Sequence, residues 1–513
     1  MTRRSGESGV AMIAAVAMLI LGAFIAVAIY VSARSTTDLS RAKLDAAAAE
    51  QLARDSGAML ANAYSTLESG EHDGFIPSQA ALQAHASRIG GSVVPNSGLP
   101  AQLGVVDSRV PAAGRYAVSQ SLRDGRTGWW QLYSVKVPEW GITPGGRVIA
   151  YVRTWTTSGA GVSLPSIYRL EFRPTWFADY QLLFDGPAGV FPGAVISGRM
   201  HSNGYATSYY DQYRGRPQIE FQGGARCTGS ARVTTAQGAI AAPGSCRARA
   251  NTGIRYNFLR AREAAARIRE LCEGGGGARP SIQMACPATQ DLVRVRLSGS
   301  SVSVSGAGTI SAAVAPGGRP GSNQGAVVIT RGDVEVSGAL GANARALIIA
   351  AAPAGASRYG SGGAPSAWIK SNGPVGAGAS PTSSFGLVVE GDIVFDEWSM
   401  NSATARGAFL TMSGMLSSHP TWRSPVTVPG GRMGGRVDVI GSITGHYPPI
   451  LQNPGNGAGF ANRSYAWSDA LYDNPPPMFP TAADWEITRM EPANLDCFSP
   501  GVGGSLLARP DCQ

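Results

Sequence analysis

The chain is poor in charged residues and almost free of lysine. Asp, Glu, Lys and Arg make up 15% of its 513 residues, whereas soluble domains average about 25%. Lysine occurs only at positions 43, 136 and 370, so arginine supplies 40 of the 43 basic residues. The arginines are scattered apart from a denser run at 247–269, so the net charge of +9 is weak evidence for nucleic-acid binding. We expect no nucleic-acid partner.

Recognisable catalytic and metal-binding patterns are also missing. The chain has no GxSxG, no HExxH, no phosphate-binding loop and no CxxC, and its five histidines stand far apart. We therefore expect a protein that is not an enzyme and that holds no cofactor and no metal. A β-helix polysaccharide lyase or hydrolase stays open as an alternative, because such enzymes use scattered carboxylates. The candidates are Asp333, Glu390, Asp392, Asp396 and Glu397.

Six cysteines are present, and thiols outside the membrane tend to be oxidised. Six cysteines allow 15 connectivities. Pairing sequence neighbours closes loops of roughly 15–20 residues, and such closure is worth about 3 kcal/mol in the chain-entropy model. On loop length alone we expect the pairs Cys227–Cys246, Cys272–Cys286 and Cys497–Cys512.

Residues 10–31 contain no charged residue and are long enough, at about 1.5 Å per residue, to span a ~30 Å hydrocarbon core. Arg3 and Arg4 precede them and should keep the N-terminus in the cytoplasm, with the rest of the chain outside. Three interpretations compete: a signal peptide cleaved after Val31-Ser32-Ala33, a plain single-pass anchor, and the first half of a longer helix. The apolar stretch exceeds the roughly 7–15 residues usual for a signal peptide.

The residues after the apolar stretch favour the longer helix. Between 32 and 67 there is no proline and one glycine, Gly57, while Leu39, Leu52, Leu60 and Leu67 fall into a helical spacing of apolar residues. The pattern predicts one helix over 10–67, apolar in its first half and amphipathic in its second.

The remaining chain predicts a mainly β protein. Aromatic and β-branched runs separated by Gly or Pro indicate a small α+β head at 68–185. Short strands recur over 186–480, with a helical insert at 255–272 and a repeated phrase at 332–336, 391–395 and 435–439. This texture is typical of a β-helix or solenoid, and a β-sandwich is the alternative. Residues 481–513 are expected to form a C-terminal strand and tail.

One short segment, 201–204, combines a histidine with a turn signal. A strand predicted at 194–200 runs into His201, Ser202, Asn203 and Gly204, and Asn-Gly favours a tight turn. His201 has no second His, Asp or Cys at ligand or triad spacing. We interpret the segment as a turn.

The N-terminus resembles that of a pilin. Arg3-Arg4 followed by Gly9-Val10-Ala11-Met12-Ile13 is similar to the prepilin pattern of a basic leader 1–9, a glycine and an apolar helix. Major pilins carry Glu at the fifth mature position, where this chain has Ala14. The chain is closer to minor pilins of the PilX kind and to the tip pseudopilin of type II secretion. The resemblance implies cleavage between Gly9 and Val10 by a prepilin peptidase.

Residues 189–491 resemble a bacterial pilus-associated domain of unassigned function. The ordered set comprises HSNG at 201–204, GDVEVSG, GLVVEGDIVF, GRVDVIGSITGHY and SYAWSDALYDNPPPMFP. That family carries no established catalytic residues to transfer.

Together these features predict a non-enzymatic, membrane-anchored structural subunit of a type IV pilus or a related pseudopilus, at its tip or in priming its assembly. Its partners would be the inner membrane and other pilins or pilus assembly proteins, with the head exposed at the cell surface. Two alternatives stay open: a cell-surface adhesin that binds a surface glycan, and the polysaccharide-cleaving enzyme.

Overall fold

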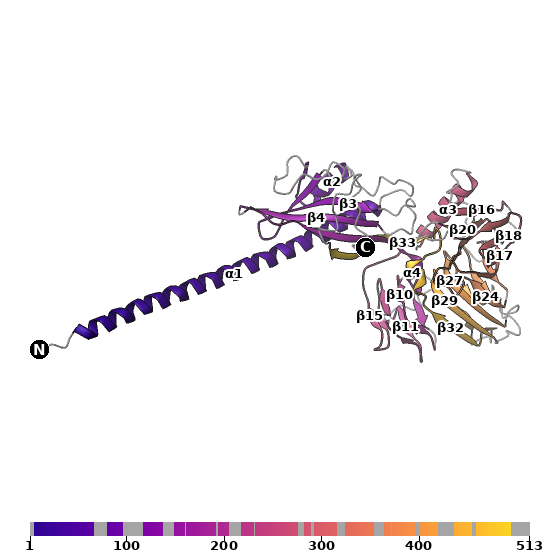
Figure 1. Cartoon of the computed structure of the whole chain (residues 1–513). Helices are drawn as coiled ribbons and strands as arrows, with labels where there is room; N and C mark the ends of the chain where they lie inside the picture. Colours follow the sequence, from indigo (N-terminus) through magenta and orange to yellow (C-terminus); the bar gives the residue numbers. More distant parts are fainter. Residues whose placement is uncertain are drawn as a thin grey trace.

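The computed structural model describes residues 5–65, 79–95, 116–136, 148–159, 161–190, 193–204, 217–229, 231–274, 282–288, 292–314, 324–352, 364–370, 372–396, 401–418, 435–453 and 458–493. Figure 1 shows a long N-terminal helix, a sheet over the end of that helix, and a larger strand-rich part. We call the sheet with the helix end that it covers the head, and residues 177–480 the large part. The protein is mainly β with one long N-terminal helix, as predicted, and its sheets are open.

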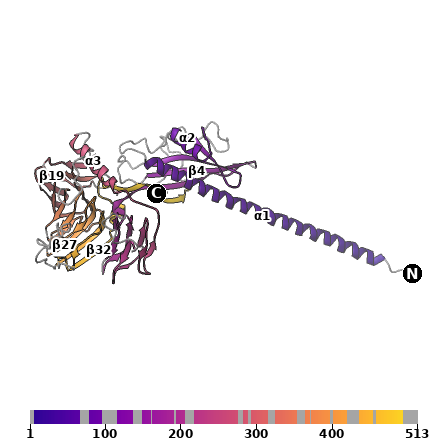
Figure 2. The ribbon, with the colours of Figure 1, turned by 180° about the vertical axis from the view of Figure 1, so that it is seen from behind.

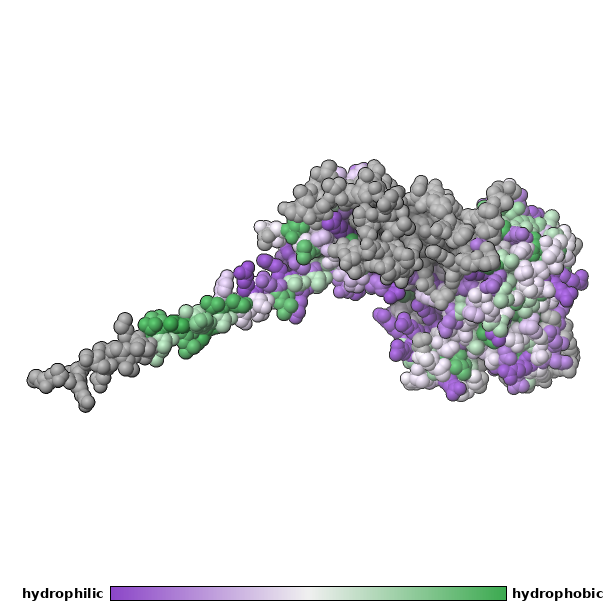
Figure 3. Space-filling model, viewed as in Figure 1, coloured by the Kyte–Doolittle hydropathy of each residue, from purple (hydrophilic) through white to green (hydrophobic). Residues whose placement is uncertain are grey.

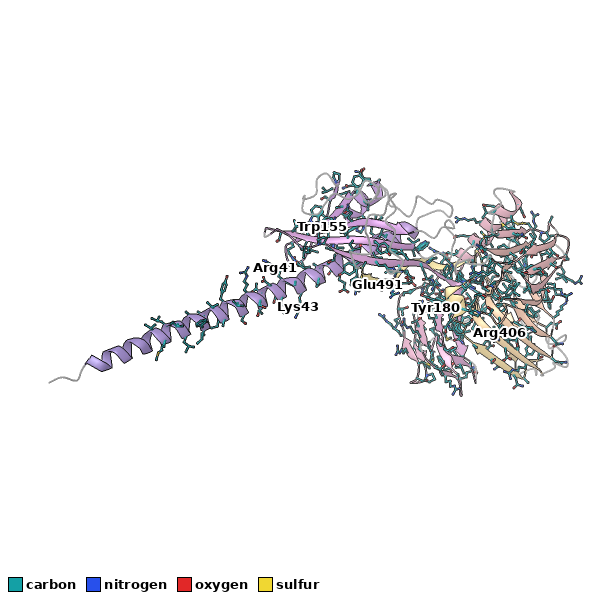
Figure 4. The ribbon with its side chains drawn as sticks, in the orientation of Figure 1. Arg41, Lys43, Trp155, Tyr180, Arg406 and Glu491 are labelled. Carbon is teal, nitrogen blue, oxygen red and sulfur yellow. A yellow bond between two sulfur atoms is a disulfide. The ribbon has the colours of Figure 1, made fainter. Side chains whose placement is uncertain are left out.

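Helix α1 (Ser5–Ser65) is one uninterrupted element of 61 residues, about 90 Å long at 1.5 Å per residue. The predicted helix over 10–67 thus begins at Ser5, and Ser65 is its last described residue. Its described side chains between Val16 and Val31 are exposed, and the helix is long and apolar enough to cross a membrane. Figure 3 shows this apolar stretch on the part of α1 that projects away from the sheet.

The head is an antiparallel sheet in the order β1-β2-β3-β4-β6-β33, with β5 paired to β4. The strands are β1 (Val93–Pro95), β2 (Tyr116–Ser121), β3 (Thr127–Lys136), β4 (Val148–Ser158), β5 (Gly161–Val162), β6 (Ser166–Trp176) and β33 (Thr481–Pro492), and helix α2 (Gln79–Arg88) lies beside them. Leu52 and Leu60 of α1 are fully buried against Trp130 and Phe172 of the sheet. The end of α1, from Ala49 on, therefore forms part of the core of the head, whereas Leu39 and Leu44 are exposed.

Gly57 brings α1 close to the edge strand of the head. A Cβ atom at this position would lie 2.4 Å from Cδ1 of Ile487 in β33. Such a distance is well inside van der Waals contact, so a Cβ at this position would require the terminal methyl group of Ile487 to move.

The last strand of the head comes from the far end of the chain. Strand β33 pairs antiparallel with β6, with Glu486 opposite Arg173 and Pro492 opposite Tyr168. The amide of Phe177, directly after β6, donates to the carbonyl of Pro480, directly before β33 (3.3 Å). The large part is therefore an insertion between two neighbouring strands of the head.

The large part consists mostly of short parallel strands. They are β7 (Leu182–Phe184), β8 (Ala188–Val190), β9 (Val195–Ile196), β10 (Arg199–Ser202), β11 (Ile219–Phe221), β12 (Arg226–Cys227), β13 (Arg232–Thr235), β14 (Ile240–Ala241), β15 (Arg247–Arg249), β16 (Ile282–Ala285), β17 (Val293–Gly299), β18 (Ser301–Val304), β19 (Gly308–Ser311), β20 (Gly325–Thr330), β21 (Val334–Leu340), β22 (Arg345–Ala350), β23 (Ala367–Ile369), β24 (Gly373–Gly376), β25 (Ser384–Val389), β26 (Ile393–Phe395), β27 (Ser402–Thr411), β28 (Leu416–Ser417), β29 (Arg436–Gly445), β30 (Gln452–Asn453), β31 (Ala458–Gly459) and β32 (Asn462–Ala466). Its helices are η5 (Phe177–Asp179), α3 (Leu259–Glu273) and α4 (Ala470–Asp473).

One ladder of parallel pairs runs through the whole large part. Its order is β16-β20-β22-β25-β27-β29-β7-β10-β13-β15. The chain enters in the middle at β7, proceeds outward to β15, and then crosses through α3 to the opposite end at β16. A second ladder, β17-β21-β23-β26-β28, runs alongside. We call the β15 edge of the first ladder its open end.

Both faces of the first ladder are buried at β20, β22 and β25, which explains the unbroken apolar sequences of these strands. In β22, Ala346 and Ile348 point into an inner core shared with the second ladder, and Leu347 and Ile349 point to the other side. Helix α3, the predicted insert at 255–272, covers that outer side with Ala261, Ala265 and Ile268. Figure 2 shows α3 and the strands of the large part from behind.

Candidate functional site

The segment 201–204 lies at the centre of a buried polar cluster in the large part. The strand predicted at 194–200 is two strands, β9 and β10, of which β10 extends through Ser202, and Gly204 has a φ of 65°. His201, Ser202 and Asn203 are 1%, 0% and 3% exposed. The segment is therefore the end of an interior strand and carries polar side chains that need hydrogen-bond partners inside the protein.

Asn203 links three separate pieces of chain. Its Nδ2 donates to Oδ1 of Asp185 (2.7 Å) and to the carbonyl of Tyr256 (2.8 Å), and its Oδ1 accepts from the amide of Tyr256 (2.9 Å). A carboxamide has both donors and an acceptor, which a carboxylate lacks. Asn203 thereby fastens the segment that leads into α3 to the end of β10.

His201 lies in an aromatic enclosure. Its Nδ1 is 2.8 Å from the hydroxyl of Thr234 on β13, and its ring meets Tyr256 edge-on at 4.8 Å and Tyr180 at 6.3 Å. The Tyr180 hydroxyl donates to the Tyr256 hydroxyl. Burial lowers the pKa of His201 to about 4, against a smaller opposing effect of its hydrogen bonds. The imidazole is therefore neutral near pH 7 and does not serve as a cation there.

Asp185 and His446 join the two segments of the ladder that meet at β7 and β29. Nδ1 of His446 is 3.0 Å from Oδ2 of Asp185, and the amide of Asp185 donates to the carbonyl of Gly445 (3.2 Å). Burial pushes the pKa of Asp185 up, but hydrogen bonds from His446 and Asn203 outweigh it and hold that pKa below its usual value. Sequence reasoning missed Asp185 and Tyr256, because neither lies near 201–204 in the chain.

A second buried cluster stands where the large part meets the head. Arg173 of β6 pairs with Asp179 of η5, and its guanidinium lies 3.6 Å from the ring centre of Tyr472 and 4.4 Å from that of Trp176. Burial raises the pKa of Asp179 to about 6 despite the nearby arginine. Cation–π contacts such as these stabilise a protein more strongly when they are shielded from water. The cluster holds α4, η5 and β6 together.

The carboxylates considered for an enzyme bind backbone amides in the structure. Oδ1 of Asp333 accepts from the amide of Ser366 (2.8 Å), and Oδ1 of Asp392 accepts from the amide of Met415 (2.9 Å). Each aspartate thus fixes the start of a neighbouring strand of the second ladder. Oε2 of Glu390 accepts from the amide of Ala352 (2.8 Å). Asp396 lies directly after β26, and Glu397 lies outside the described residues.

Two of the expected disulfides are present. Cys227 pairs with Cys246 and Cys272 pairs with Cys286, with Cα atoms 5.0 and 6.2 Å apart. The first joins β12 to the residue before β15, and the second joins α3 to the residue after β16. Cys497 and Cys512 lie outside the described residues.

The predicted processing site lies within α1. Gly9 and Val10 belong to the helix, which continues without a break from Ser5. The described residues contain no group of three or more His, Cys, Asp or Glu placed to bind a metal ion. A comparison of the chain with protein-family models, with curated proteins and with solved structures finds no match.

Proposed function

We propose that the protein is a non-enzymatic, membrane-anchored, pilin-like subunit that mounts the large part on a type IV pilus or a related pseudopilus. The observation that carries the proposal is α1, one 61-residue helix whose described side chains between Val16 and Val31 are exposed and whose residues from Ala49 on belong to the core of the head. A plain anchor has no need of a helix that continues unbroken into the folded domain.

The exposed half of α1 needs a partner. Its large apolar side chains in this stretch are more than 45% exposed, and none of them packs on the protein's own sheets. Exposed apolar surface of this extent marks a membrane or protein contact. In the proposed role the same side chains face lipid before assembly and neighbouring pilin helices after it.

Ala14 and the size of the large part support a position at the tip. In major pilins the glutamate at the position of Ala14 is thought to pair with a neighbouring subunit's N-terminus, so a subunit without it does not need a neighbour ahead of it. An insertion of residues 177–480 adds bulk that is difficult to repeat along a thin filament. Both features suit a subunit that starts the filament and stays at its end.

We further propose that the parallel ladders of the large part are the walls of a β-helix-like solenoid. Apart from β29 and β7, neighbouring strands of each ladder come from successive stretches of chain, and both ladders share one inner core. The aspartates at 333 and 392, which fix successive strands, support a structural use of these carboxylates over a catalytic one.

Mass spectrometry of the native N-terminus tests the pilin proposal. We expect the mature chain to start at Val10, and a strain that lacks the prepilin peptidase should retain residues 1–9. An intact N-terminus would indicate a plain anchor, and a start at Arg34 a secreted protein. Deletion of the gene should reduce piliation, and normal piliation together with an uncut N-terminus would overturn the proposal.

A further inference from the structure

Most of the net positive charge of the chain lies in one segment of the large part. Residues 221–262 contain seven arginines and no aspartate or glutamate. The rest of the chain holds 36 basic and 34 acidic residues and is nearly balanced. Most of the net charge of +9 therefore belongs to 42 residues of the 513.

The fold places four of these arginines, Arg226, Arg232, Arg247 and Arg249, at the open end of the first ladder, whereas Arg260 and Arg262 lie on α3. Arg232 of β13 lies directly opposite Arg247 of β15, and Thr234 lies opposite Arg249. Among the described residues, β15 has a paired register with β13 alone, and Figure 1 shows it at the outer edge of the large part. The disulfide Cys227–Cys246 fixes the start of β15 and brings Arg226 to the same edge.

The arginine side chains point away from the protein. Val233, between Arg232 and Thr234, is fully buried in the inner core, so by the alternation of a strand Arg232 faces outward. Arg226, Arg247 and Arg249 are also exposed. Neighbouring parallel strands are about 4.8 Å apart and every second residue along a strand about 6.6 Å, so these side chains form a compact cationic patch.

The patch is not neutralised by the protein itself. Within the part of the chain that the structure describes, no carboxylate lies within ion-pair distance of Arg226, Arg232, Arg247 or Arg249. The opposite end of the large part differs: Glu335 lies 4.0 Å from Arg294 and 3.7 Å from Lys370. Unpaired like charges repel one another, so this arrangement weakens the fold unless an anion binds.

We propose that the open end of the ladder binds an acidic polysaccharide through Arg232, Arg247 and Arg249. A linear polymer with a carboxylate on each sugar meets several guanidinium groups at once, and each pair can form two parallel hydrogen bonds. Single exposed pairs are weak, so binding depends on several of them acting together. The proposal is independent of whether the protein is part of a filament.

The same face lacks the features of a nucleic-acid site. Proteins that hold single strands combine positive charge with exposed aromatic rings on which the bases stack. The aromatic residues of 221–262 are Phe221, Tyr256 and Phe258, and all three pack against the cores. An acidic polysaccharide does not need an exposed aromatic ring on the protein, because its carboxylates are attracted by the arginines.

The test is binding of polygalacturonate by the full chain in detergent, with R247Q/R249Q compared against R294Q/R296Q. Both variants remove two exposed arginines that are two residues apart on a strand, from β15 and from β17 respectively. We expect the first to weaken binding by at least about tenfold and the second to leave it unchanged. Binding should weaken steadily as salt is raised, and neutral dextran should not bind.

Three outcomes would overturn the proposal. They are no binding of polygalacturonate by the wild-type chain, equal losses in the two variants, and tighter binding of a single-stranded oligonucleotide than of polygalacturonate. Circular dichroism of both variants separates lost binding from lost folding. If R247Q/R249Q fails to fold, R232Q with R296Q as its partner control repeats the comparison with single changes.

Discussion

At the scale of single residues, His201 illustrates how burial converts a common pH sensor into a structural group. Its imidazole, enclosed by Tyr180 and Tyr256, has a pKa of about 4 instead of 6.5. The folded state therefore resists a proton that the unfolded chain takes up readily. Its Nδ1 is bonded to Thr234, whereas its buried Nε2 has no hydrogen-bond partner among the described residues.

This burial predicts a defined pH dependence of stability. Above pH 6.5 the histidine is neutral in both states, and its effect is fully present. As pH falls from 6.5 to about 4, only the unfolded chain binds the proton, so the free energy of unfolding falls by about 3 kcal/mol in total. Urea unfolding of the large part across this range should show the loss, and His201→Gln should flatten it.

Thr234→Val is the matched control for that measurement. It removes the hydroxyl bonded to Nδ1 of His201 but keeps the titrating imidazole, so the overall stability should fall while the pH dependence remains. An unchanged pH dependence in the His201→Gln protein would contradict the explanation.

At the scale of elements, Gly57 controls the fit between α1 and β33. Gly57→Ala gains up to about 1 kcal/mol of helix propensity, but its Cβ would lie 2.4 Å from Cδ1 of Ile487. Overpacking typically costs 1–3 kcal/mol, so we expect a net destabilisation of the head of about 1 kcal/mol. Thermal unfolding should show it, and the double variant G57A/I487V, which lacks that Cδ1, should recover the loss.

A Gly57→Ala protein as stable as the wild type, with no further gain in the double variant, would show that the helix and strand can move apart freely. Ile487→Val alone serves as the reference, because it removes the same methyl group without adding a Cβ.

The disulfide Cys272–Cys286 makes a separate prediction for α3. It ties the end of this helix to the residue after β16, and loss of such a closure costs about 2–4 kcal/mol. In a C272A/C286A protein we expect α3 to be cut early in limited proteolysis while the ladder strands resist. The C227A/C246A protein should instead expose the segment around β15, and the same cleavage pattern in both would contradict this assignment.

Local sequence patterns predict several of the elements, but they do not predict which residues far apart in the sequence are in contact. The long helix, the insert at 255–272 and two disulfides follow from periodicity and loop length over a few tens of residues. The pairing of β6 with β33 and the contact of Asp185 with His446 join residues that are hundreds of positions apart. Nothing in the local sequence around Asp185 distinguishes it from other loop carboxylates.

At the scale of the whole molecule, the insertion of the large part between β6 and β33 predicts a head that folds without it. Phe177 and Pro480 are joined by a backbone hydrogen bond, so a short Gly-Ser linker can replace 178–479. We expect this shortened protein to keep the antiparallel sheet in hydrogen-exchange and circular dichroism measurements. A chain truncated after 176 should not, because it lacks β33, whose Ile487 and Trp485 pack on the core of the head.

A well-folded chain truncated after 176 would show that β33 is dispensable, and a disordered linked head would show that the large part is needed for folding. Gly57→Leu in the linked head provides an internal check, because its side chain would overlap Ile487 and should loosen the same strand.

The chain passes between the head and the large part twice, and this arrangement has a mechanical consequence. In the proposed role, tension between the large part and α1 enters the head at two adjacent points, after β6 and before β33. These strands are hydrogen-bonded to each other, and both contact α1. The load divides between two neighbouring strands, so neither is peeled alone from the sheet, as a single linker would peel the strand to which it is joined.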